Sequence, residues 1–178
     1  GRRLAEAGYI VAAVDHHGNT AAEPYYDARG FRMPWERAVD LSRIIDHLLN
    51  DAELSQRIDA TRIAAVGFSL GGYTVLALAG ARLDLDRLEK FCSSPDRDAT
   101  CDPQPEYPDA EAKFNELLKS DSDLQSRFVQ HGDSFHDPRV NAVVALAPAL
   151  AAAIDPKSLE RISIPVGIIV GTEDQLAP

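Results

Sequence analysis

Short apolar runs alternate along the chain with segments whose apolar residues recur every three or four positions. The continuous runs, rich in Val, Ile and Ala, are typical of strands that are buried on both faces of a parallel sheet. They occupy residues 8–15, 62–69, 140–148 and 165–171. Their alternation with helical patterns predicts an α/β fold, a parallel sheet whose strands are joined by crossover helices.

The clearest helical pattern follows the first run and a long loop rich in turn-forming residues. Pro34 suits the first turn of a helix, where its missing N–H costs nothing. The positions that keep the spacing of one buried stripe are Ala38, Leu41, Ile45 and Leu48.

The regular alternation is interrupted between about residues 81 and 137. Four of the eleven prolines lie between Pro95 and Pro108, charges are dense, and one helical stripe occupies residues 109–120. We expect an insertion here, which either covers one end of the strands as a lid or cap or is a surface excursion.

Size and charge limit the further possibilities. A chain of 178 residues closes one core, and the opening "GRRLAEAGYIV" is typical of the end of a helix, so we expect residues 1–178 to form a partial domain, incomplete at both ends. A net charge of −10 disfavours nucleic acid. The longest nearly apolar run, 142–154, contains a proline and is shorter than the roughly 20 residues of a transmembrane helix, so a soluble segment is expected.

Cys92 and Cys101 are the only cysteines. They either close a small surface loop as a disulfide, which favours an exported protein, or stay reduced in the cytoplasm. Two thiols without histidines at ligand spacing do not make up a four-ligand set, so no metal and no organic cofactor is expected.

Candidate chemistry lies in "AAVGFSLGGYTVLALAG", residues 64–80. Gly67-Phe68-Ser69-Leu70-Gly71 matches the Gly-x-Ser-x-Gly nucleophile elbow, between an apolar strand run and an apolar helix run. A sharp turn there strains the backbone of Ser69 and exposes its hydroxyl, while Gly67 and Gly71 relieve crowding. The Leu70 N–H at the helix start then points to where an oxyanion forms.

The chain resembles the α/β-hydrolases on this motif. More narrowly, "AAVDHHGNT", the elbow and "VVALAPAL" resemble bacterial predicted dienelactone hydrolases, a group similar to platelet-activating-factor acetylhydrolases. The resemblance implies an acid in "IIVGTEDQLAP", at Asp174 or less favourably Glu173. Two departures remain: those acetylhydrolases carry their acid after the preceding strand, and true dienelactone hydrolases have cysteine where this chain has Ser69. Neither substrate can therefore be carried over.

The family histidine follows the acid, and only "QLAP" follows Asp174. We therefore expect the catalytic histidine outside this segment. His47 is expected on a helix, and His131 and His136 in the insertion. His16 and His17 follow the first strand run, where they could line the pocket.

The favoured function is a serine hydrolase of carboxylic esters, with Ser69 as nucleophile and Asp174 orienting the histidine. Its expected partner is a small-molecule ester, with lipid esters included. Two alternatives stay open: a serine peptidase of the prolyl-oligopeptidase type, and a non-catalytic hydrolase-fold module that binds a ligand or a partner.

Overall fold

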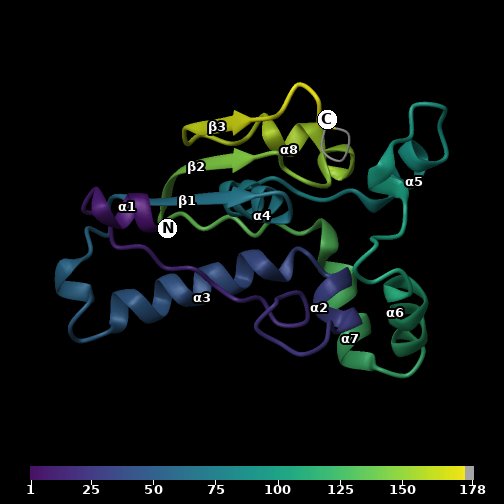
Figure 1. The fold of residues 1–178 in the computed structure, drawn as a ribbon, viewed down its shortest axis with the longest axis horizontal. Coiled ribbons are helices and arrows are strands. Elements are labelled where there is room, and N and C mark those ends of the chain that lie inside the picture. Colours follow the sequence, from purple (N-terminus) through teal and green to yellow (C-terminus); the bar gives the residue numbers. More distant parts are fainter. Residues whose placement is uncertain (175–178) are drawn as a thin grey trace.

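The structure is a computed structural model that describes residues 1–174; residues 175–178 of the expected domain lie outside the described residues. Figure 1 shows the elements in chain order. The α-helices are α1 (Arg2–Glu6), α2 (Ala28–Arg32), α3 (Glu36–Asn50), α4 (Leu70–Ala79), α5 (Leu85–Cys92), α6 (Ala110–Leu118), α7 (Ser122–Phe128) and α8 (Pro156–Leu159). Short 3₁₀ helices are η1 (Ser55–Arg57), η2 (Ala99–Cys101), η3 (Val129–Gly132) and η4 (Ala151–Ala153), and the strands are β1 (Ile63–Phe68), β2 (Val140–Leu146) and β3 (Val166–Ile169).

The three strands form one parallel sheet in the order β1-β2-β3. Phe68 pairs with Leu146, and Leu146 pairs with Ile169, so the carboxyl ends of all three strands share one edge. The α/β class and three of the four predicted strands are thus confirmed. This edge is where parallel sheets present their functional loops.

The strand predicted at residues 8–15 is wrong. Residues 9–15 belong to no strand, and Tyr9, Ile10 and Val11 are exposed. A strand exists through backbone hydrogen bonds to a neighbour, and no segment among residues 1–174 pairs with this one. The apolar composition of the run is not sufficient to supply that neighbour.

Burial on both faces is also wrong for two of the three strands. The central strand β2 buries Val140, Val143 and Ala145, but β1 alternates half-buried and exposed positions and β3 is mostly exposed. Helix α4 packs on β1 and β2. The opposite face carries exposed Phe68 and Val66 instead.

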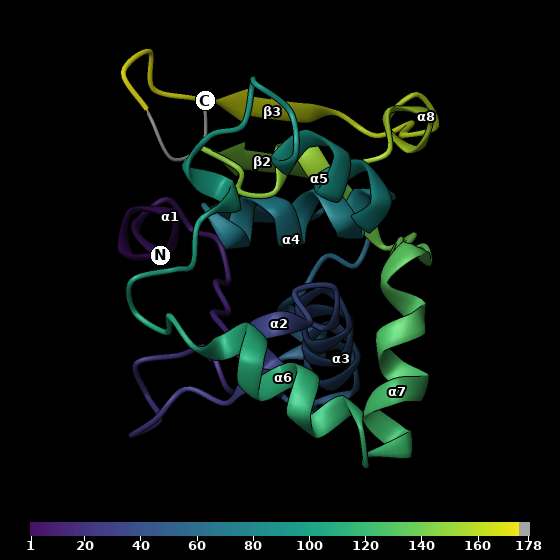
Figure 2. The ribbon, with the colours of Figure 1, turned by 90° about the vertical axis from the view of Figure 1, so that its right-hand side faces the viewer.

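Helix α4 lies at the centre of the molecule. Its residues from Gly72 to Ala79 are all buried, as expected for a helix that is apolar all round. Figure 2 shows it between the strands and the group formed by α2, α3, α6 and α7. The predicted helix after Pro34 is confirmed as α3, with Leu41 and Ile45 packed against the core.

The segment 81–137 leaves the sheet after α4 and returns at β2. The helix expected at 109–120 is confirmed as α6, whose Phe114 is buried in the common core together with Leu124 of α7. Ion pairs join the segment to the rest of the domain, Arg127 with Glu36 and Arg29 with Asp121. Its action as a cap stays a prediction.

Of the two alternatives for Cys92 and Cys101, the structure has the disulfide, with 5.5 Å between the two Cα atoms. It joins the end of α5 to η2 and closes a polar loop. Within residues 1–174, no helix combines the length and the apolar character that a membrane span requires.

Candidate active site

The chain turns sharply at Ser69, between the last residue of β1 and the first of α4. The serine has φ 54° and ψ −119°, a conformation that L-residues rarely adopt. Such strain persists only where the surroundings enforce it, and it gathers at functional sites. The turn expected from the sequence is therefore present.

Ser69 stands at the N-cap of α4 but does not cap the helix with its side chain. Serine is favoured at this position because its oxygen usually accepts a hydrogen bond from a free amide of the first turn. Here the strained backbone directs the hydroxyl elsewhere, and the residue is half-buried. The hydroxyl is consequently not used to stabilise the helix.

The glycines around Ser69 are not equivalent. A Cβ atom at Gly67 would lie 2.0 Å from the carbonyl oxygen of Gly71, and one at Gly72 would lie 2.8 Å from the Cα of Pro148. A Cβ at Gly71 would have nothing within 4 Å. The expectation that Gly71 relieves crowding through its missing side chain is therefore wrong. The missing side chains of Gly67 and Gly72 are the ones that relieve crowding. The sequence signal for Gly72 was that it directly follows Gly71 of the motif.

Backbone hydrogen bonds connect the strand ends at the carboxyl edge of the sheet, next to this turn. The Ser69 N–H donates to the Leu146 carbonyl over 2.9 Å, and the Ala147 N–H donates to the Ile169 carbonyl over 2.7 Å. Two further strained residues, Ala147 (φ 41°) and Leu150 (φ 61°), lie just after β2. All three strained non-glycine residues of the described chain thus lie at or just beyond one edge of the sheet.

Leu70 opens α4, so its N–H has no acceptor inside the helix. The peptide group that carries this N–H has its oxygen on Ser69. That oxygen accepts hydrogen bonds from the N–H groups of Tyr73 (3.2 Å) and Ala149 (3.0 Å). Donors on the oxygen polarise the peptide and strengthen its N–H as a donor.

Asp174 follows β3 at the same edge, in a turn where its N–H donates to the Gly171 carbonyl over 3.2 Å. Adjacent strands lie about 5 Å apart, so the ends of β1 and β3 are separated by about 10 Å. A histidine ring and its two hydrogen bonds span a gap of this order. The position fits the predicted acid, whose role stays a prediction.

The candidate histidines have other partners. His16 is buried, with Nδ1 2.8 Å from an oxygen of Asp40 on α3, whereas the exposed His17 lies 2.7 Å from Glu23. His47 is exposed on α3, as expected. His131 bonds the Phe128 carbonyl. Pocket lining by His16 and His17 stays a prediction.

Sequence reasoning missed two polar residues near the turn. The Arg37 Nε donates to the Thr74 hydroxyl over 3.3 Å, and that hydroxyl donates to the Leu70 carbonyl over 2.8 Å. Burial lowers the pKa of Arg37, with Asp40 opposing the effect. The available sequence signal was a basic residue, Arg37, directly before Ala38 of the apolar stripe predicted for this helix.

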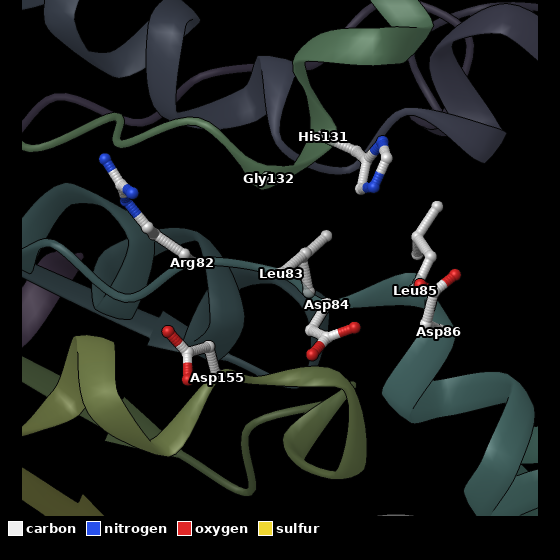
Figure 3. A pocket seen from close by; sticks show the side chains of 8 residues that line it. All are labelled: Arg82, Leu83, Asp84, Leu85, Asp86, His131, Gly132 and Asp155. Carbon is white, nitrogen blue, oxygen red and sulfur yellow. The ribbon is translucent and has the colours of Figure 1, made fainter.

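A shallow depression elsewhere does not belong to this site. Figure 3 shows its lining, formed by Arg82, Leu83, Asp84, Leu85, Asp86, His131, Gly132 and Asp155. It lies beyond the C-terminal end of α4, about 15 Å of helix away from Ser69. Asp84 and Asp155 accept bonds from backbone amides as the N-caps of α5 and α8.

Among residues 1–174, no three His, Cys, Asp or Glu side chains are grouped to hold a metal.

The family model described as "Alpha/beta hydrolase family" matches residues 2–178. The chain belongs to this family, as the elbow and the parallel sheet indicate.

Among characterised relatives, the chain is similar to cutinases of Thermobifida. It is 39% identical to cutinase est1 of Thermobifida alba over 87 residues, which are 48% of this chain and 26% of that protein. It is 36% identical over 87 residues to cutinase 2 of Thermobifida cellulosilytica and to cutinase cut1 of Thermobifida fusca, covering 48% of this chain and 29% and 24% of those proteins. The matched segment spans about a quarter of their length. No solved structure matches the chain.

Proposed function

We propose that the protein is a serine hydrolase of carboxylic esters, in which Ser69 attacks the ester carbonyl. The observation that carries the proposal is the strained Ser69 at the start of α4, whose side chain does not cap the helix. Membership of the hydrolase family and the similarity to cutinases, which are ester hydrolases, support it.

The reaction follows from these parts. The Ser69 oxygen bonds to the carbonyl carbon while a histidine outside the sequence takes its proton, and Asp174 orients that histidine. The Leu70 N–H stabilises the negative oxygen of the tetrahedral intermediate. The histidine then gives the proton to the leaving alcohol, and water releases the acid from Ser69 by the same steps.

The substrate we propose is a small-molecule ester, with lipid esters included. The similarity to cutinases, which are ester hydrolases, supports the ester class. A series of p-nitrophenyl esters of increasing acyl length tests it with the full-length protein. The expected result is hydrolysis that Ser69→Ala abolishes, with Ser158→Ala as a control far from the elbow.

The alternatives give different results in the same assay. If a proline-containing peptide analogue blocks the activity and esters are poor substrates, the protein is a peptidase. If no ester or peptide is cleaved and the full-length protein holds no histidine after Asp174, the protein is a non-catalytic binding module with the hydrolase fold.

We also propose that the protein works in an oxidising compartment outside the cytoplasm. The disulfide between Cys92 and Cys101 supports this, since such bonds persist mainly in exported proteins. Alkylation of the protein in freshly opened cells should leave both cysteines unmodified until a reductant is added. Two alkylated thiols without reductant would contradict the proposal.

A further inference from the structure

A basic side chain is held against the most apolar helix of the molecule. Arg37, in the first turn of α3, reaches α4 and donates through Nε to the hydroxyl of Thr74, which is 1% exposed. Burying a guanidinium is costly unless its donors are bonded. Asp40, one turn further along α3, partly offsets the effect of burial on the Arg37 pKa, and His16 in turn bonds Asp40.

The contact fixes the direction of the Thr74 hydroxyl. An arginine is only a donor, so the hydroxyl oxygen accepts from Arg37 and its single proton goes to the Leu70 carbonyl, 2.8 Å away. A helical threonine can bond the carbonyl four residues earlier by itself. The hydrogen bond from the guanidinium favours the rotamer of Thr74 that makes this bond.

The first turn of α4 is thereby held from two sides. The Leu70 carbonyl is bonded by Thr74, and the Ser69 carbonyl accepts from the Ala149 N–H of the loop after β2. The peptide group that joins Ser69 to Leu70 contains the Ser69 carbonyl and the Leu70 N–H, and the Leu70 carbonyl belongs to the next peptide group. The orientation of the Leu70 N–H depends on both attachments.

We propose that Arg37 and Thr74 are positioning residues that aim the Leu70 N–H at the oxyanion. The proposal rests on the ester hydrolase function, in which that N–H stabilises the transition state. Loss of either side chain should lower kcat and leave substrate binding nearly unchanged.

Thr74→Val, which keeps the shape and removes the hydroxyl, tests this in the full-length protein with a p-nitrophenyl ester. We expect kcat to fall about tenfold, less than the loss of a whole oxyanion donor, with KM within about twofold. Thr74→Ser should restore kcat to within about twofold of the wild type. The matched control is Ser158→Ala, since the Ser158 hydroxyl is equally buried and bonded but lies near the other end of α4.

Arg37→Lys gives a second test if Thr74→Val does not fold. The lysine keeps the charge but lacks the Nε donor, so kcat should again fall while KM is retained. Wild-type kcat in Thr74→Val or in Arg37→Lys, or an equal loss of kcat in Ser158→Ala, would overturn the proposal and leave the hydrolase function standing. Wild-type protein that hydrolyses no ester would remove both together.

Discussion

Single residues at the elbow decide how closely α4 approaches the sheet. The Cβ that alanine would add at Gly67 meets a backbone oxygen, which cannot move without displacing the helix. At Gly71 the added atom meets open space, and alanine is favoured over glycine within a helix by up to about 1 kcal/mol. Alanine should therefore be tolerated at Gly71 and not at Gly67.

We predict that Gly67→Ala destabilises the protein by about 3 kcal/mol or more through this overlap. Gly71→Ala should leave the free energy of unfolding unchanged or raise it slightly. Urea unfolding of both variants measures the difference. An equal loss of the free energy of unfolding in both variants would contradict the described turn.

Asp137 is the most strongly held carboxylate near the amino end of the sheet. It is 3% exposed, and hydrogen bonds from Arg139 lower its pKa to about 2. The unfolded-state pKa is about 3.9, so the carboxylate contributes stability above that pH and loses the contribution as the pH falls towards 2. Asp137→Asn should cost about 2 kcal/mol at pH 7, and the gap to wild type should narrow below pH 4. A gap that is constant from pH 7 to pH 3 would contradict this assignment.

Pairs of elements show which parts of the fold could be predicted from the sequence. The elbow could be predicted, because Gly67, Ser69 and the flanking apolar runs lie within one short stretch of the sequence. The missing strand at 8–15 could not, because pairing depends on a distant neighbour that composition does not reveal. The same holds for Arg127, which bonds Glu36 from 91 residues away. Local chemistry was accessible, and long-range contacts were not.

The disulfide connects two elements of the insertion, α5 and η2. Closing a loop of about ten residues restricts the unfolded chain and is worth about 2 to 3 kcal/mol. The double variant Cys92→Ser, Cys101→Ser should lose that much in urea unfolding. Reduced wild-type protein should unfold at the same urea concentration as the double variant. A fully stable variant would show that the loop is already ordered without the bond.

At the scale of the whole molecule, the described sheet has an apolar face that no helix of residues 1–174 covers. Phe68 is 71% exposed and Ile169 is 61% exposed, and both lie on this face, because each pairs in register with Leu146 of the central strand. Contiguous apolar surface of this kind drives association in water. The 178-residue chain, produced alone, should self-associate with rising concentration.

Phe68→Gln combined with Ile169→Gln should reduce that association. Val129→Gln is the matched control, because Val129 is equally exposed at 72% but lies on η3, away from the sheet. Sedimentation velocity measures the effect. If the double substitution on the sheet does not change the association, or if Val129→Gln reduces it equally, the surface that drives association lies elsewhere.

The central claim is that the backbone turn at Ser69 presents an activated nucleophile. A fluorophosphonate reacts with activated serines, and mass spectrometry of the labelled full-length protein identifies the modified residue. The account predicts one phosphonyl group, on Ser69, and none in Ser69→Ala. Label on another serine, or equal labelling of the wild type and Ser69→Ala, would contradict it.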